Sequence, residues 1–233
     1  MAVTTAFKPD PRRTLGYRAF RTFVHTLWGA YFRPQVTGTE HVPTTGAYII
    51  APIHRSNADF AFAIYVTERK TFFMAKDELW KSTLLGDFVG AMGAFPVTRG
   101  VADRTALSAA EAVLRAGEPL VLFPEGTRQD GPAVGELLEG ASFLAARTGA
   151  PIIPVGIAGT DRALPRGKKV PRPVKVRVVI GEPVAAPIAH DGARVPRSQI
   201  TATTAALRDA LQAAYDQACG RLSAPGSTSG RPR

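Results

Sequence analysis

Cysteine is nearly absent from this chain, which carries only Cys219 among its 233 residues. A single thiol excludes an internal disulfide framework and a metal site built from cysteines. Long apolar runs are also missing, since no uninterrupted stretch approaches the roughly 18 residues of a membrane-spanning helix. Arg12 and Arg13 are followed by no clean apolar segment and small-residue cleavage site, so we identify no signal peptide. We expect a protein that lies in the cytosol or on a membrane without crossing it.

Negative charge is scarce relative to positive charge, with 19 acidic against 29 basic residues and a net charge of +10. This surplus indicates an anionic partner, such as nucleic acid, an acidic membrane or a phosphorylated substrate. No recognised nucleic-acid motif or array of stacking aromatics is present, so we expect no nucleic acid as a partner. The hydrophobic content of 45% is typical of a folded globular protein.

Hydrophobic patterning predicts strands that alternate with helices, which indicates a single α/β domain with a mostly parallel central sheet flanked by helices. We assign residues 1–34 to an N-terminal arm and amphipathic helix, 35–220 to the domain and 221–233 to a disordered polar tail. Expected strands are 35–38, 48–53, 71–74, 94–98, 120–123, 152–158 and 174–180. Expected helices are 15–32, 59–69, 77–92, 103–116, 136–147 and 200–218.

The helix expected over residues 15–32 has an aromatic face, formed by Phe20, Phe23, Val24, Leu27 and Tyr31. Arginines and a histidine lie on another face, a pattern that suits the water–lipid interface. The alternative is that the aromatic face packs on the core of the domain. Both can hold in part, with one end of the helix docked and the other in contact with the membrane.

An apolar strand ends at His54, and Asp59 follows five positions later. The carboxylate can accept a hydrogen bond from one ring nitrogen and leave the other free to take a proton, as in the base and orienting residue of a triad. The alternative is a loop histidine beside an aspartate or asparagine that caps a helix. No Gly-x-Ser-x-Gly elbow is present, which argues against covalent catalysis.

Three cations, Lys76, Arg99 and Arg128, follow separate predicted strands, and Arg55 lies next to the histidine. The carboxyl ends of parallel strands share one edge of a sheet, so these loops are expected to converge. Arginine and lysine suit a phosphate group there. Each cation alone is equally compatible with a solvated surface charge.

The segment Glu125-Gly126-Thr127-Arg128 follows a buried strand. Its glycine allows the backbone to approach a ligand closely. Glu125 has two interpretations, either direct contact with substrate or an ion pair with an arginine that holds the loop.

Four motifs, in this order and spacing, resemble those of the glycerophospholipid acyltransferases over roughly residues 35–185. They are His-x4-Asp at 54–59, Gly-Ala-Phe-Pro-Val-Thr-Arg at 93–99, Phe-Pro-Glu-Gly-Thr-Arg at 123–128 and Ile-Pro-Val-Gly at 153–156. The chain departs from the family pattern at three positions that bear on the acceptor: Ile53 stands where asparagine is common, Thr98 where an acidic residue is common, and Gln129 where serine is common.

The resemblance implies an O-acyltransferase in phospholipid biosynthesis. His54 would act as general base on the free hydroxyl of 1-acyl-sn-glycerol-3-phosphate, Asp59 would fix its tautomer, and acyl-CoA or acyl carrier protein would donate the acyl group to give phosphatidic acid. Lys76, Arg99 and Arg128 would hold the acceptor phosphate, while Glu125, Gly126 and Thr127 would complete the substrate site, with amides near Gly126 stabilising the oxyanion. No metal and no separate cofactor is implied.

Three alternatives remain: another acceptor (glycerol-3-phosphate, a different lyso-phospholipid or a glycolipid), a thioesterase, or a non-catalytic basic module. A basic segment over residues 162–177 suits anionic headgroups or the phosphates of CoA. We therefore expect peripheral attachment to the cytoplasmic face of the plasma membrane, through an anionic lipid surface.

Overall fold

The central element of the computed structural model, which describes residues 11–97, 104–188 and 194–220, is one seven-stranded sheet. The strand order is β1-β7-β6-β2-β5-β3-β4. All neighbouring strands run parallel except β6 and β7. The strands are β1 (Gln35–Thr37), β2 (Ile49–Pro52), β3 (Phe72–Lys76), β4 (Ala94–Val97), β5 (Leu120–Val121), β6 (Ile152–Ala158) and β7 (Arg177–Ile180). The predicted α/β class with a mostly parallel sheet is confirmed.

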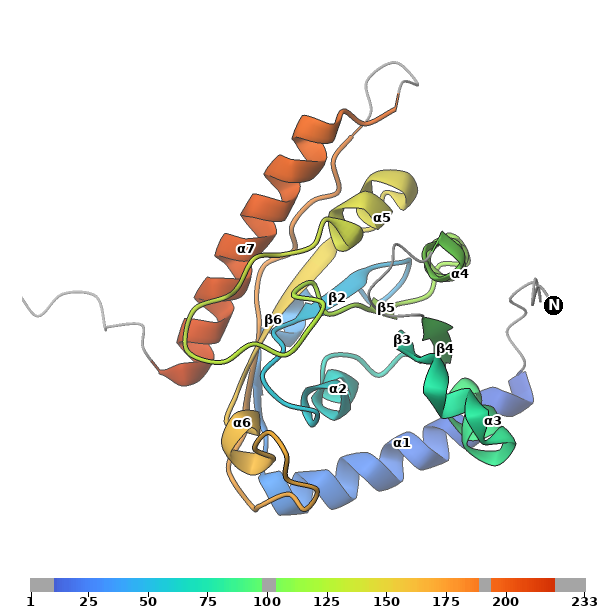
Figure 1. The fold of residues 1–233 in the computed structure, drawn as a ribbon, viewed down its shortest axis with the longest axis vertical. Helices are drawn as coiled ribbons and strands as arrows, with labels where there is room; N and C mark the ends of the chain where they lie inside the picture. Colours follow the sequence, from blue (N-terminus) through green and yellow to red (C-terminus); the bar gives the residue numbers. More distant parts are fainter. Residues whose placement is uncertain (1–10, 98–103, 189–193, 221–233) are drawn as a thin grey trace, which may run out of the picture.

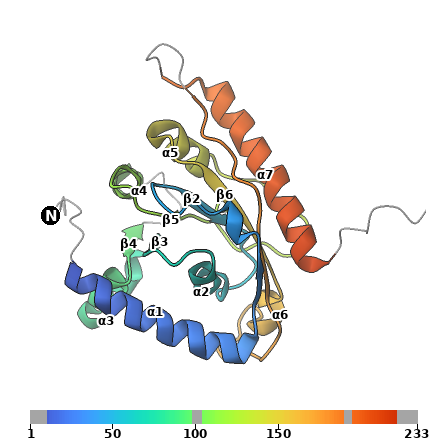
Figure 2. The same cartoon turned by 180° about the vertical axis from the view of Figure 1, so that it is seen from behind.

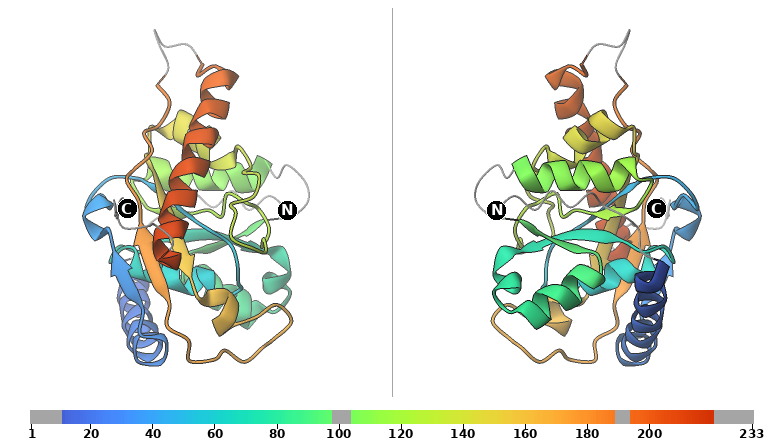
Figure 3. Two further views of the ribbon diagram at one scale, coloured as in Figure 1. Left: turned by 90° about the vertical axis from the view of Figure 1, so that its left-hand side faces the viewer. Right: turned by 90° about the vertical axis from the view of Figure 1, so that its right-hand side faces the viewer.

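Helices cover both faces of this sheet (Figures 1 and 2). One layer contains α4 (Arg104–Arg115), α5 (Gly140–Thr148) and α7 (Arg197–Cys219). The opposite side carries α1 (Pro11–Phe32), α2 (Asp59–Phe62) and α3 (Thr83–Ala91), while the short α6 (Thr160–Ala163) follows β6. Figure 3 shows α7 along one side of the sheet, away from α1. In the described part of the chain, no helix is long and apolar enough to cross a membrane.

The central strand β2 is buried along its whole length, because neighbouring strands and helices enclose it on every side.

The strand beside it, β6, packs against α7 at very short range. A Cβ atom on Gly156 would lie only 2.3 Å from the backbone carbon of Ala214 in α7. Glycine is therefore required at this crossing of strand and helix.

The expected elements are present, with shifted ends. The strand over 152–158 matches β6, whereas the helix expected over 59–69 ends at Phe62 and continues only as a 3₁₀ turn, Ala63–Tyr65. The helix expected from residue 136 begins at Gly140, because the amides of Gly135 and Leu138 bond to Glu125 and to the carbonyl of Pro124 instead. The expected arm over residues 1–10 and the disordered tail over 221–233 lie outside the described residues.

Helix α1 packs on the domain through one face and leaves another open. Its packed side includes the buried Tyr17 and Phe32 and the side chain of Arg21, which donates to the carbonyls of Ile64 and Thr67. Arg21 belongs to the face with arginines and a histidine that the sequence predicts, so part of that face docks on the domain. The open face carries three large apolar side chains one turn apart, Phe23 (64% exposed), Leu27 (53%) and Tyr31 (41%). The helix is thus docked on the domain through a face other than the one that carries Phe23, Leu27 and Tyr31. Contact of that open face with a membrane stays a prediction.

Candidate active site

The sheet brings the predicted site segments to one edge. Strands β2, β5, β3 and β4 are parallel neighbours in that order, so their carboxyl ends lie side by side. His54 follows β2, and the segment that begins with Phe123 follows β5. The backbone of Lys76 ends β3, opposite Val97 of β4. Arg99 lies outside the described residues.

His54 and Asp59 form the hydrogen bond that their spacing predicts. Nδ1 of His54 lies 3.1 Å from Oδ2 of Asp59, whose side chain is fully buried. The same Oδ2 accepts the backbone N–H groups of Arg55 at 2.6 Å and Ser56 at 2.7 Å. These amides precede Asp59 in the chain, so the carboxylate closes a turn behind itself and does not cap the helix ahead of it. The helix-capping interpretation was therefore wrong.

The histidine ring is fixed on a second side by Phe123. The two ring centroids are 4.3 Å apart with an angle of 33° between the planes. Since Nδ1 faces Asp59, Nε2 is the nitrogen that can exchange a proton with a ligand. The side chain remains 13% exposed, so it reaches the surface. The arrangement suits a general base with a fixed orientation.

The backbone of His54 is held by the segment after β5. Its N–H donates to Oε2 of Glu125 at 2.8 Å, and its carbonyl accepts the N–H of Gln129 at 2.9 Å. The two loops are thus bonded to each other directly beside the reactive ring.

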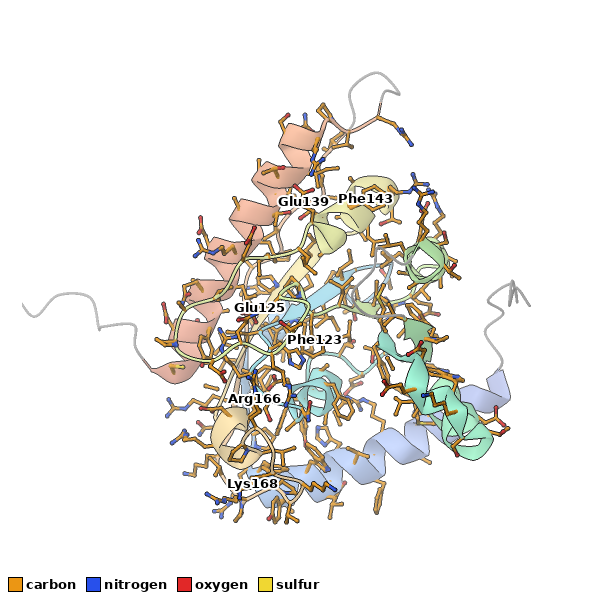
Figure 4. All side chains as sticks on the ribbon, in the orientation of Figure 1. Phe123, Glu125, Glu139, Phe143, Arg166 and Lys168 are labelled. Atoms are coloured by element: carbon orange, nitrogen blue, oxygen red, sulfur yellow. The ribbon has the colours of Figure 1, made fainter. Side chains whose placement is uncertain are left out.

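A buried ion pair between Arg55 and Glu125 lies at the centre of this junction. Nη1 of Arg55 donates to both carboxylate oxygens of Glu125, at 2.9 and 3.0 Å, with both side chains almost inaccessible. Nε and Nη2 of Arg55 donate to the carbonyls of Gly131 and Ala133. Figure 4 shows Glu125 and Phe123 near the middle of the molecule. Of the two roles considered for Glu125, these contacts are those of a residue that holds the loop.

The remaining residues of this segment differ in whether their polar groups are free to bind a ligand. The amide of Gly126 donates to the carbonyl of Phe123, and the amide of Thr127 donates to the carbonyl of Glu125. Neither amide is therefore free to stabilise an oxyanion, in contrast to the expectation from the sequence. Gly126 has φ +67°, a conformation that favours glycine. Arg128 is half-buried, and its guanidinium forms no ion pair within the described residues.

Sequence reasoning missed the structural roles of Arg55 and Phe123. Arg55 was named only as the cation next to the histidine, and the arginine that could pair with Glu125 was not identified as Arg55. The signal was present, because an arginine beside the histidine and a glutamate in the third motif are complementary charges. Phe123 belonged to an apolar run, which gives no hint of ring stacking.

The chain is similar to several known acyltransferases. A 1-acyl-sn-glycerol-3-phosphate acyltransferase of Bacillus subtilis is 28% identical over 182 residues, covering 76% of this chain and 86% of the relative. A chloroplastic 1-acyl-sn-glycerol-3-phosphate acyltransferase of Arabidopsis thaliana is 27% identical over 186 residues, covering 75% and 50%. A chloroplastic counterpart in Brassica napus is 25% identical over 176 residues, with 72% and 51% covered, so this chain spans about half the length of these two plant relatives.

The fold has a solved counterpart in the 1-acyl-sn-glycerophosphate acyltransferase of Thermotoga maritima. The TM-score is 0.66 at 24% identity, with 87% of this chain and 83% of that chain covered. The family model described as Acyltransferase matches residues 33–158, which is more than half of the sequence and includes His54, Asp59 and the whole segment 123–128. The chain belongs to the acyltransferase family.

Proposed function

We propose that this protein transfers a fatty acyl group from a thioester, acyl-CoA or acyl carrier protein, to the free hydroxyl of 1-acyl-sn-glycerol-3-phosphate, giving phosphatidic acid. The observation that carries the proposal is the hydrogen bond from His54 Nδ1 to the buried Asp59, which leaves Nε2 as the proton acceptor. The relatives from Bacillus subtilis and Arabidopsis thaliana are named for acylation of this acceptor, which supports the choice.

In the proposed reaction, Nε2 of His54 takes the proton of the acceptor hydroxyl as its oxygen attacks the thioester carbonyl. A tetrahedral intermediate forms, its C–S bond breaks, and the leaving thiolate takes the proton from the imidazolium. The new ester and a free thiol are the products, and no oxidant or reductant is consumed. Asp59 holds the ring in the tautomer that presents a bare Nε2. General-base assistance of this kind is typically worth about 10²–10⁴ in rate.

The acceptor phosphate is assigned to Arg128, together with Lys76 and Arg99. Arg128 follows directly on the turn that bonds to His54, and no carboxylate of the described residues neutralises its charge. Lys76 ends β3, which is paired in parallel with β4, and this supports its inclusion. Arg99 is included from the sequence alone, because it lies outside the described residues. Gly126 and the exposed Thr127 border this position. Glu125 supports it through Arg55.

Attachment to an anionic membrane at the cytoplasmic face is proposed from two features that meet at one end of the molecule. The exposed apolar face of α1 ends at Tyr31, whose hydroxyl donates to the carbonyl of Pro171 at 2.9 Å. Pro171 belongs to the exposed loop after α6, in which Val170 is 78% exposed. The cations of this loop are Arg166, Lys168, Lys169, Arg172 and Lys175, and Figure 4 shows Lys168 beside the end of α1. Apolar side chains flanked by cations suit a lipid surface.

The experiment that tests the proposal measures thiol release from acyl-CoA by the purified chain, with and without 1-acyl-sn-glycerol-3-phosphate in mixed micelles. We expect release that depends on the acceptor, with phosphatidic acid formed in equal amount. Release that ignores the acceptor would identify a thioesterase. Activity with glycerol-3-phosphate or another lyso-phospholipid alone would keep the chemistry and change the acceptor. Acyl carrier protein as donor is the parallel assay, and His54→Ala is the blank for both.

A further inference from the structure

The C-terminal helix α7 lies outside the segment that the family model matches, which ends at residue 158. It nevertheless contacts the loops of the candidate active site. Two of its residues, Gln212 and Tyr215, face the segment 129–139, which we call the strap. The strap runs from the end of the Phe123–Arg128 motif to the start of α5 and contains no helix or strand.

The ring of Tyr215 packs against the guanidinium group of Arg55. The carbon at the centre of the Arg55 guanidinium lies 5.2 Å from the centroid of the Tyr215 ring, and both side chains are buried. A cation over an aromatic face is attracted by the ring, and more strongly when water is excluded. Burial, followed by the neighbouring Cys219 thiol, raises the pKa of Tyr215 to about 12. The ring therefore stays neutral under any ordinary assay condition.

Gln212 holds the strap directly. Its Oε1 accepts the N–H of Val134 at 2.7 Å, and its Nε2 donates to the carbonyl of Pro132 at 3.1 Å. Nε2 also donates to Asp216 one turn along the helix, which fixes the orientation of the amide.

The same strap is bonded on its other side to the active-site junction. Arg55 donates to the carbonyls of Gly131 and Ala133, and Oε1 of Glu125 accepts the N–H of Gly135 at 3.1 Å. Glu125 in turn accepts the N–H of His54. A continuous set of contacts thus runs from α7 through the strap and the ion pair to the backbone of the histidine.

We infer that Gln212 and Tyr215 are positioning residues for His54, acting through Arg55 and the strap. The inference rests on the proposed function for its kinetic consequence. A reacting group displaced by about 1 Å loses on the order of 10²-fold in rate, and partial loosening loses less. Since Arg128 takes no part in these contacts, kcat falls while the KM for the acceptor stays close to that of the wild type.

Four single variants of the full chain test the inference in the acyl-transfer assay. Tyr215→Leu and Gln212→Leu are each expected to lower kcat roughly 10-fold with little change in KM. Tyr215→Phe keeps the ring beneath Arg55 and is expected to retain the activity of the wild type. Gln217→Leu, on an exposed position of the same helix, is the control. Wild-type kcat in both leucine variants, or a loss in Tyr215→Phe equal to that in Tyr215→Leu, would overturn the inference.

Hydrogen–deuterium exchange supplies a readout that needs no activity. Gln212→Leu should speed exchange in peptides that contain the amides of His54 and Gly135, relative to Gln217→Leu, while β6 keeps its protection. Exchange at His54 that does not change would refute the inference even where the variant is fully folded. A wild-type protein without acyl transfer would refute the proposed function alone, since the exchange result stands apart from it.

Discussion

Two arginine-bearing regions of this molecule differ in how their charge is neutralised. At the junction of the loops after β2 and β5, Arg55 is buried and bonded to both oxygens of Glu125 and to two carbonyls. In the loop after α6, the cations are exposed, and the ion pair of Arg166 with Asp130 is open to solvent. The first region uses charge to hold the backbone in place, whereas the second leaves charge available to a partner. A count of cations near a motif therefore overstates the number that can bind phosphate.

The strongest test of the buried region removes the base that it holds. His54→Ala is expected to lower the rate of acyl transfer by about 10²–10⁴, because it removes the nitrogen that takes the proton of the acceptor hydroxyl. The fold is expected to remain intact. Steady-state rates and circular dichroism measure the two expectations. Near-normal turnover in this variant would break the mechanism.

The next largest effect is expected from Glu125→Gln, which leaves Arg55 buried without an opposite charge. Such a change typically costs about 3–5 kcal/mol of unfolding free energy. Denaturant unfolding provides the measurement, with Glu136→Gln at an exposed position of the strap as control. The double variant Arg55→Met with Glu125→Gln should cost less than the sum of its parts, because no unpaired charge remains. A cost equal to that of the control would mean that the ion pair does not hold the junction.

The exposed region is tested with lipid vesicles. Lys168→Gln with Lys169→Gln should weaken binding to vesicles containing anionic lipid by roughly 30-fold, at about 1 kcal/mol for each charge near the surface. The matched control neutralises Arg104 and Arg208, which are exposed on α4 and α7 in the opposite helix layer. Equal losses in both pairs would show that net charge matters and this loop does not. Raising the salt concentration should reduce the difference in vesicle binding between the two double variants.

The smallest effect is expected for an ion pair that is neither fully buried nor fully exposed. Glu111 of α4 bonds to Arg147 of α5 at 2.6 Å, and this bond, with help from Arg115, lowers the pKa of Glu111. A folded-state pKa below the unfolded value stabilises the protein at neutral pH, and this stabilisation disappears as the pH falls through the lowered pKa. Glu111→Gln should therefore lower Tm by no more than about 3 °C at pH 7 and by less near pH 3. A difference that grows on acidification would contradict this assignment.

The fold and the position of the site were largely accessible from the sequence. Apolar runs that end in polar residues gave the strands, and the spacing from His54 to Asp59 gave their hydrogen bond. The helix boundary at residue 140 was not accessible, because the amides before it are used by Glu125 and by the carbonyl of Pro124, which are distant contacts without a local signal. Local propensity alone favours a longer helix there.

An ion pair of Glu125 with an arginine was one of two interpretations, but the sequence does not say which arginine is the partner. Arg55 and Arg128 have the same chemistry and lie in the first and third motifs, and only burial separates a structural arginine from one with available charge. Gln212 and Tyr215 carry no motif at all, since their relation to the strap exists only once α7 crosses β6. The substrate contacts of Lys76, Arg99 and Arg128 remain predictions.

The hydrogen atom that serves as the side chain of Gly156 has a consequence for reading related chains. It lets α7 approach β6 so closely that Tyr215, directly after Ala214, comes within reach of Arg55. A chain with a larger residue at this strand position must carry its last helix further out, where an aromatic ring of the same length no longer meets the guanidinium. Glycine in the strand and the aromatic residue in the helix should therefore be gained and lost together, although some 60 residues separate them.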